Sequence, residues 1–339
     1  MSLSQQNIQN NEIDHRYLDL TIRGTESVLQ TASFSATRTI PYLKTCNEFE
    51  LGIVRFSVPS TLIPIFFFGE KVYRVSLGYS NVNVDVNVIY SPDTLVVSPY
   101  SVDKPVYSVS NFIRWINTAL STANTTLQTL QPLYTATAPQ IEYEPSTRLF
   151  KLYAPTIYNS TLATPAFVGF NSTLYDFLRS FGASYVSLTD TFVLDVYPTL
   201  TNTQTINTIN YIVITTDTPI VDNWETLQQV VISTSSIPVN PEMRAFGNTS
   251  LPVQRSILTD FNFSGLLEDN ALLQYYTSGY VRWYDLLSNN ELNRVDLEML
   301  WVDREGKTYP IYLLANETAN LKICFRKKSR FSNGYIDMN

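Results

Sequence analysis

The alternation of apolar and polar residues near the C-terminus predicts a ribbon of antiparallel strands. In "VDLEMLWVD" the apolar residues Val295, Leu297, Met299 and Trp301 occupy every second position, which is the period of a β-strand with one buried face. Residues 303–306, Asp-Arg-Glu-Gly, offer a turn former followed by a glycine, as a short hairpin loop requires. "TYPIYLL" and "LKICF" then predict two further strands.

The same period recurs on both flanks of the chain. Within 15–100 we expect strands in "YLDLTI", "FELGIVRFSVP" and "VNVDVNVIY", and within 225–328 in "LQQVVISTSSIPV" and "RSILTDFNF". In "VNVDVNVIY" four valines alternate with Asn and Asp, which predicts one dry and one wet face. The flanks together supply about eight strands or more, the number that a two-sheet jelly roll requires.

The middle of the chain changes to a helical period. "SNFIRWINTALSTA", with Ser110 as a candidate N-cap, and "NSTLYDFLRSFG", ended by Gly182, predict helices on either side of a hairpin in "QIEYEPSTRLFKLYAP". The predicted fold class is therefore mainly β, a single jelly-roll antiparallel sandwich with an inserted α+β domain. We expect a flexible N-terminal arm at 1–14, the jelly roll at 15–100 and 225–328, the insertion at 101–224 and a C-terminal tail at 329–339.

The composition narrows the function. Charged residues make up 16% of the chain, which instead carries 22 Tyr and 18 Phe; an average protein has about 25% charged residues. Large aromatic contact area with few charges suits a protein that packs against copies of itself. The same residues are also strand formers, which explains them equally well. The formal net charge of −7 argues against a general nucleic-acid binder.

Residues and motifs typical of catalytic sites are nearly absent from the sequence. His15 is the only histidine, so no second imidazole exists to share a metal or a catalytic site with it. Cys46 and Cys324 lie far apart and predict buried free thiols, which favours folding inside a cell. We therefore expect no enzyme, no metal and no cofactor. The N-terminus lacks a signal-peptide pattern, and the apolar run "LIPIFFFG" is far shorter than the roughly 20 residues of a membrane span.

One apolar run is a candidate subunit interface. In "STLIPIFFFG" the consecutive residues Ile65, Phe66, Phe67 and Phe68 are all apolar, so a strand cannot hide all four on one face. The alternative is a strand that is buried on both faces beneath the insertion.

Positive charge gathers at the C-terminal end of the last strand, in Lys322, Arg326, Lys327, Lys328 and Arg330. This basic patch could contact phosphates or an acidic neighbour, and the alternative is simply a solvated strand end.

Three stretches resemble a known family. "YVRWYDLLSNNELNRVDLEMLWVDREGKTYPIYLLANETANLKICF", "FELGIVRFSVPSTLIPIFFF" and "SILTDF" are similar to segments of the minor capsid (penton) proteins of virophages and of the related Polinton-like viruses. The resemblance covers about a third of the chain, and none of its motifs is catalytic.

The resemblance implies a vertex capsomer of an icosahedral shell. Five copies of the jelly roll would surround the five-fold axis as a homopentamer, with the insertion facing outward. The implied partners are the chain itself, the neighbouring major capsid protein and, through the insertion, a host-cell receptor or glycan. The chain would be part of the virion and would be assembled inside the host cell.

Two other functions also fit the sequence. A jelly roll of this length could be the major capsid protein of a small virus. A carbohydrate-binding β-sandwich could instead use aromatic residues as sugar platforms, the candidates being Trp115, Trp224, Trp283 and Trp301.

Overall fold

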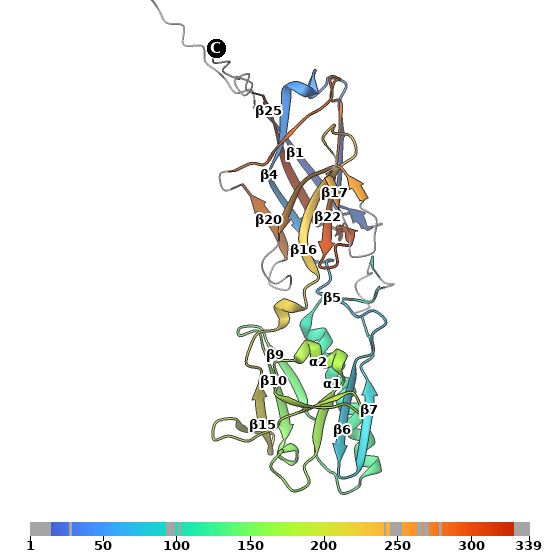
Figure 1. Cartoon of the computed structure of the whole chain (residues 1–339), viewed down its shortest axis with the longest axis vertical. Coiled ribbons are helices and arrows are strands. Elements are labelled where there is room, and N and C mark those ends of the chain that lie inside the picture. The colour runs from blue at the N-terminus through green and yellow to red at the C-terminus, as the bar shows by residue number, and fades with distance from the viewer. Residues whose placement is uncertain are drawn as a thin grey trace, which may run out of the picture. The chain divides into compact units, whose positions relative to one another are not determined.

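The computed structural model describes residues 15–26, 29–92, 99–100, 103–240, 242–244, 253–262, 267, 271–277 and 280–328. The chain forms two compact units (Figure 1). The jelly-roll unit comprises Met1–Leu62, Leu227–Ser264 and Asn270–Asn339, and the inserted unit comprises Ile63–Thr226 with Gly265–Asp269. The expected arm at 1–14 and tail at 329–339 lie outside the described residues.

The first sheet of the jelly-roll unit is antiparallel and joins strands from both flanks of the chain. Its order is β1-β25-β4-β20, and β21 pairs with another part of β4. The bounds are β1 (His15–Arg23), β25 (Thr318–Lys327), β4 (Phe49–Pro59), β20 (Leu272–Tyr276) and β21 (Trp283–Asp285).

The second sheet of this unit has the order β19-β16-β22-β23, and β3 pairs with another part of β22. The bounds are β19 (Ile257–Asn262), β16 (Leu227–Thr234), β22 (Arg294–Asp303), β23 (Thr308–Pro310) and β3 (Ser33–Thr37). Two small two-stranded ribbons complete the unit, β2 (Gln30–Thr31) with β24 (Tyr312–Leu313) and β17 (Glu242–Arg244) with β18 (Val253–Arg255).

The strand pairs are nested in the manner of a jelly roll. Taken in chain order, β1 pairs with β25, β3 with β22, β4 with β20, and β16 with β19. The outermost strands of the sequence therefore pair with each other, and the innermost strands do the same. Eight strand positions wound in this way over two sheets define the jelly roll, so the predicted fold class is confirmed.

The predicted C-terminal ribbon is present and forms part of the core. Val295, Leu297, Met299 and Trp301 are all buried, and Trp301 stacks on Tyr309 with 4.3 Å between ring centroids. The turn closes through a hydrogen bond from Gly306 N to Asp303 O of 3.0 Å. Gly306 has φ +85°, a conformation that glycine adopts without a steric penalty. Between the sheets, Phe56 of β4 contacts Phe261 of β19 at 4.8 Å.

The described residues of the inserted unit form two larger sheets and two α-helices. One sheet has the order β12-β13-β11-β6-β7, the other β14-β15-β10-β9, and β5 pairs with β8. The strands are β5 (Phe66–Phe67), β6 (Arg74–Tyr79), β7 (Val82–Asn87), β8 (Pro105–Val106), β9 (Gln140–Glu144), β10 (Leu149–Pro155), β11 (Phe167–Phe170), β12 (Ala183–Val186), β13 (Thr191–Leu194), β14 (Thr203–Ile206) and β15 (Ile209–Thr215). The helices are α1 (Val109–Leu130) and α2 (Ser172–Leu178).

Helix α1 packs its predicted apolar stripe on β6, β7 and β9. Asn117 fixes it to β9, because its side-chain amide donates to Ile141 O and accepts from Ile141 N, both at 2.8 Å. The helix begins one residue before the predicted cap Ser110. The residue at its N-cap is Ser108, whose side chain makes no capping hydrogen bond. At α2 the side chain of Asn171 accepts from Leu174 N at 3.2 Å, so this helix has a side-chain cap.

The expected start of the insertion at residue 101 differs from the structure. Residues 63–100 belong largely to the inserted unit, which begins at Ile63. The buried face of β6 and β7 explains this boundary. Its residues Val75, Leu77 and Val84 lie in a core shared with α1, so both strands belong to the inserted unit. The alternation correctly predicted a strand with one dry face but gave no information on which unit covers that face.

Candidate functional site

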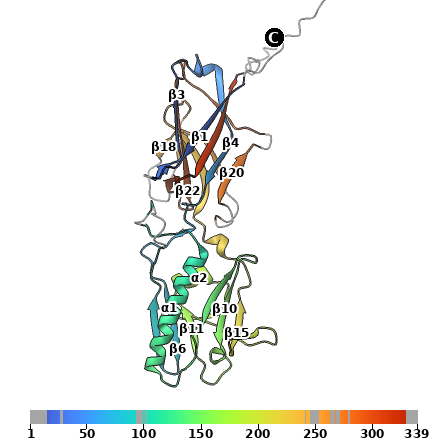
Figure 2. The same cartoon turned by 180° about the vertical axis from the view of Figure 1, so that it is seen from behind.

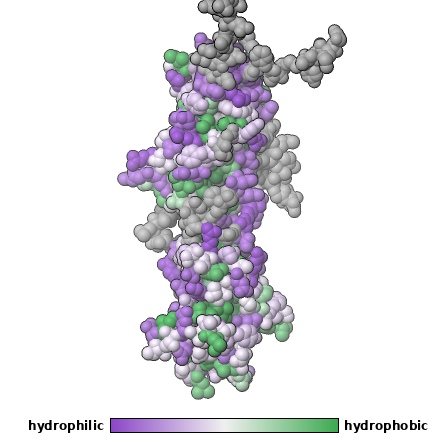
Figure 3. All heavy atoms as spheres, turned by 90° about the vertical axis from the view of Figure 1, so that its left-hand side faces the viewer, coloured by the Kyte–Doolittle hydropathy of each residue, from purple (hydrophilic) through white to green (hydrophobic). Residues whose placement is uncertain are grey.

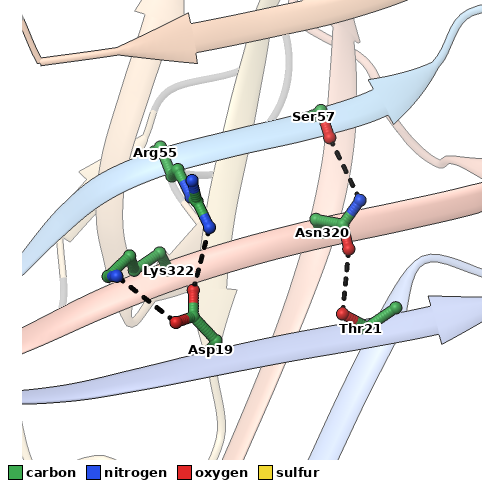
Figure 4. A network of polar contacts seen from close by, with 6 residues as sticks. All are labelled: Asp19, Thr21, Arg55, Ser57, Asn320 and Lys322. Carbon is green, nitrogen blue, oxygen red and sulfur yellow. Dashed lines mark hydrogen bonds and ion pairs between the residues drawn. The ribbon is translucent and has the colours of Figure 1, made fainter.

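The outer face of the first jelly-roll sheet carries a row of three charged residues from three strands. Asp19 of β1 lies opposite Lys322 of β25, which lies opposite Arg55 of β4. The carboxylate of Asp19 is 3.3 Å from Lys322 Nζ and 3.4 Å from the Arg55 guanidinium (Figure 4). The side chains of Asp19 and Arg55 are 55% and 52% exposed. The row is therefore accessible, and two cations share one carboxylate.

A second, uncharged row lies two residues further along the same strands. The side chain of Thr21 donates to Asn320 Oδ1 at 2.8 Å, and Asn320 Nδ2 donates to Ser57 Oγ at 3.3 Å (Figure 4). Asn320 serves both neighbours because its amide is donor and acceptor at once. Both rows follow from the strand period, which places alternate residues of each strand on the same face.

The basic residues at the end of β25 are paired with acids of the same chain. Arg326 binds Glu50 through two nitrogens, with Nε to Oε2 at 3.0 Å, and its guanidinium lies 4.1 Å from the ring centroid of Trp283. Lys327 Nζ is 3.8 Å from Glu48. Lys328 Nζ is 2.7 Å from Asp285.

The expectation of an open basic patch therefore needs correction. Lys322, Arg326, Lys327 and Lys328 each lie within ion-pair distance of a carboxylate, so they hold sheet strands together and their charge is largely offset. Arg330 lies outside the described residues.

The predicted subunit interface in the apolar run is wrong for three of its four residues. Ile65, Phe66 and Phe68 are 2%, 4% and 5% exposed and belong to the core of the inserted unit. The ring of Phe66 contacts Phe112 at 5.0 Å. The structure agrees with the alternative of a strand buried on both faces. Phe67 is half-buried, with its ring 6.2 Å from that of Tyr100, and an interface role for it stays a prediction.

The tryptophan side chains proposed as alternative sugar platforms have little accessible surface. Trp115 and Trp224 are each 6% exposed and Trp301 is 0% exposed. Trp283 is half-buried beneath the Arg326 guanidinium. Three of the four indoles are core residues and cannot stack on a sugar.

Both cysteines are buried free thiols, as predicted. Burial raises the pKa of Cys46 and of Cys324, and the hydrogen bond with Tyr17 partly opposes this shift at Cys324. His15 is exposed and stacks on Tyr17 with 6.2 Å between ring centroids. Among the described residues, no group of three or more His, Cys, Asp or Glu side chains could hold a metal ion. No described helix is long and apolar enough to cross a membrane.

The jelly roll is a fold class that includes viral capsid and lectin domains. The sequence profile of the family "Sputnik minor capsid protein V18/19" matches residues 16–327. The chain belongs to this family. It is therefore a structural component of a viral capsid and not an enzyme, as the resemblance implied. Since the family is one of minor capsid proteins, the match favours this role over that of a major capsid protein.

Individual relatives agree with the family. The chain is 24% identical to structural protein V19 of Sputnik virophage over 203 residues, which cover 55% of this chain and 93% of that protein. It is 27% identical to the uncharacterized protein V18 of the same virophage over 142 residues, covering 33% and 83%.

Two solved structures share the fold. A chain of the 3.5 Å cryo-EM structure of the Sputnik virophage is 24% identical, with a TM-score of 0.78 over 94% of this chain and 99% of that chain. The crystal structure of the mavirus penton protein is 15% identical, with a TM-score of 0.71 over 93% and 100%.

Sequence reasoning did not find the polar rows. The wet positions of β1 were visible as Tyr17, Asp19 and Thr21 in alternation with apolar residues. Their partners in β25 and β4 are about 300 and 36 residues away, and only the strand register brings them together.

Proposed function

We propose that the chain is a vertex capsomer that assembles as a homopentamer around the five-fold axis of an icosahedral shell. Membership of a minor capsid protein family supports a role at special positions of the shell. The fold similarity to the mavirus penton protein supports the vertex as that position. A closed ring of identical chains needs two different surfaces that complement each other.

Charge complementarity between the two sheets of the jelly-roll unit is the observation that carries this proposal. The first sheet presents Arg55 and Lys322 on its exposed face. The second sheet presents a groove of about 570 Å³ that contains Asp296 and Glu298 and is lined by Ser33, Ser35, Ser233 and Thr234. With two cations to one carboxylate, the row keeps an excess of positive charge. The groove keeps an excess of negative charge, because it holds two carboxylates and Arg294 pairs with Asp296. The row of one copy can therefore face the groove of the next copy, and this contact repeats around a ring.

The inserted unit has its own role in the proposal. It is inserted between β4 and β16 of the jelly roll and has a separate core. An addition of this kind is tolerated because the nested pairs β1·β25, β3·β22, β4·β20 and β16·β19 remain intact. In the proposed capsomer the inserted unit faces outward and contacts a host-cell receptor or glycan, while the ring contacts the neighbouring major capsid protein.

The test is the native mass of the full chain and of charge-reversal variants. Lys322→Glu places a carboxylate opposite Asp296 and Glu298 of the next copy. Because like charges across an interface cost several kcal/mol, we expect the pentamer to dissociate at micromolar concentration. Adding Glu298→Lys restores opposite charges and should restore the pentamer mass.

Lys151→Glu is the matched control, because Lys151 is a similarly exposed cation (30% against 26% for Lys322) that pairs with Glu144 in the inserted unit. This variant should keep the pentamer. A native chain that stays monomeric at assembly concentrations would refute the pentamer, and a pentamer that tolerates Lys322→Glu would refute the charge contact between copies.

A further inference from the structure

One end of the inserted unit lies far from the points where the chain enters and leaves it. These points are close together, because Thr226 N donates to Ile65 O and Ile65 N donates to Val106 O, both at 2.8 Å. Helix α1 starts three residues after Val106 and has 22 residues, which corresponds to about 33 Å. The C-terminal end of α1 therefore lies at the opposite end of this unit (Figure 2).

Three loops gather at that end, and we name them the tip loops: residues 130–135, 159–164 and 196–202. The hydroxyl of Tyr134 lies 2.5 Å from that of Tyr158, which joins the first loop to the segment before the second. Ser160 N donates to Val196 O at 2.8 Å, which joins the second loop to the third. The turn between β6 and β7 closes the group, because the ring of Tyr79 lies 5.6 Å from that of Tyr134.

The tip loops expose large apolar side chains that project singly. Leu200 is 104% exposed and Leu133 is 85% exposed, so almost nothing of either side chain is covered. The other members are Leu130, Leu162 and Tyr197, at 56%, 44% and 52%. Figure 3 shows hydrophobic surface at the lower end of the inserted unit.

Charge is absent from the sequence around these side chains. The stretches 115–141, 152–175 and 196–216, which contain the tip loops, hold no Asp, Glu, Lys or Arg. The polar groups there are the hydroxyls of Thr, Ser and Tyr and the amides of Asn and Gln. A partner that covers this end would therefore desolvate no ionic group, which is the most costly kind of burial.

We propose that the tip loops insert into the surface of a bilayer of zwitterionic lipids. This inference rests on the proposed outward position of the inserted unit and assigns the contact at this end to lipid, in place of a receptor or glycan. Hydrocarbon closes around single projecting leucines, whereas a rigid protein or glycan would need a matching hole for each. Tyrosine is favoured at the membrane–water interface, where Tyr197 would lie. The hydroxyls and amides would face the headgroups, and the apolar side chains would enter by about 5–10 Å.

The test is flotation of the full chain with phosphatidylcholine vesicles. The variant carrying both Leu133→Ser and Leu200→Ser should lose roughly tenfold in partitioning for each leucine, the change that about 1.4 kcal/mol produces. Binding should not change between low and high salt, because no charged group takes part. The melting temperature should stay unchanged, since both side chains are exposed.

Leu188→Ser is the matched control. Leu188 is 97% exposed in the turn between β12 and β13, next to Thr189, whose carbonyl accepts from Arg74 at the end of β6 away from Tyr79. This variant should bind vesicles like the native chain.

Several outcomes would overturn the inference. They are an absence of vesicle binding, an equal loss in Leu188→Ser, a requirement for anionic lipid with salt sensitivity, and capture by a neutral glycan or a soluble protein in place of vesicles. The native mass of the same samples reports on the pentamer separately, so the vertex proposal and this inference can fail independently.

Discussion

The two units of the chain differ in where their charged residues lie. On the jelly-roll unit, the sheet face around Asp19, Arg55 and Lys322 carries charges that are paired across strands. The inserted unit contains long stretches without any charged residue, such as 115–141. A charged face specifies the register and the orientation of a partner with complementary charge. A charge-free end with projecting leucines provides apolar contact and uncharged hydrogen-bonding groups, so the two units are suited to different kinds of partner.

The cores of the units also differ in how they are assembled. In the jelly-roll unit, strands contribute alternate residues such as Leu321, Ile323 and Phe325, which are all buried. In the inserted unit, four aromatic rings surround Phe112 at 5.0–5.7 Å. They belong to Phe66 of β5, Tyr73 just before β6, Phe177 of α2 and Trp224 near the C-terminal limit of the unit. The first kind of core is visible in a sequence as a period, whereas the second depends on segments that meet only in the fold.

Deletion tests most directly whether the two units fold independently. Replacing residues 63–226 with a short linker should leave a soluble jelly-roll unit that melts cooperatively, because the pairs of its two sheets remain complete. Replacing only 101–222 should give an aggregating protein, because loss of α1 uncovers Val75, Leu77 and Val84. Circular dichroism melts and light scattering distinguish the two. If both deletions behave alike, the boundary at Ile63 is wrong.

A single core substitution tests whether the aromatic cluster supports the inserted unit alone. Phe112→Ala removes a ring that is 0% exposed and should lower the free energy of unfolding of this unit by about 3–5 kcal/mol. Phe67→Ala removes a half-buried ring that packs on Tyr100 outside this core, so it should cost clearly less and serves as the control. Calorimetry with limited proteolysis identifies which unit melts. Destabilisation of the jelly-roll unit by Phe112→Ala would show that the cores are not independent.

The smallest expected effect concerns the hydroxyl of Tyr73. This group is buried and has no hydrogen-bond partner among the described residues, and such a group costs about 1–3 kcal/mol. Tyr73→Phe should therefore stabilise the inserted unit by about 1 kcal/mol at neutral pH.

The same substitution predicts a pH dependence. Burial raises the pKa of Tyr73 from 10.0 to about 12, so above pH 10 the unfolded chain loses this proton while the folded chain keeps it. Ionisation then favours the unfolded state, and stability falls as the pH rises from 10 towards 12. Phenylalanine cannot ionise, so the advantage of Tyr73→Phe should grow over this range. Thermal melts at pH 8 and pH 10.5 measure it, and an advantage that shrinks at high pH would contradict the argument.

Much of the fold could be predicted because the strand period is local. The residues Val295, Leu297, Met299 and Trp301 identify their own buried face without knowledge of any partner. The insertion boundary could not be predicted in the same way. Both a sheet partner and a helix can cover the valine face of β7, and only the structure shows that α1 does so.

The candidate site was less predictable for a related reason. Four consecutive apolar residues at 65–68 fit an exposed contact and a doubly buried strand equally well, and the difference depends on Phe112, about 45 residues away. The basic residues of β25 looked unpaired because their acids, such as Glu50 for Arg326, come from the other flank of the chain. Interactions set by strand register leave little signal in a single sequence.

The pairing of β1 with β25 has a consequence for synthesis of the protein. His15–Arg23 finds its partner only when Thr318–Lys327 has been made, which takes about 15–60 s at 5–20 residues per second. The inserted unit is almost entirely one continuous segment and can fold while the ribosome is still working. The jelly roll closes last, so a chain truncated before Thr318 lacks the strand that joins β1 to β4 and presents no complete first sheet. Only full-length copies can then take a place in the shell.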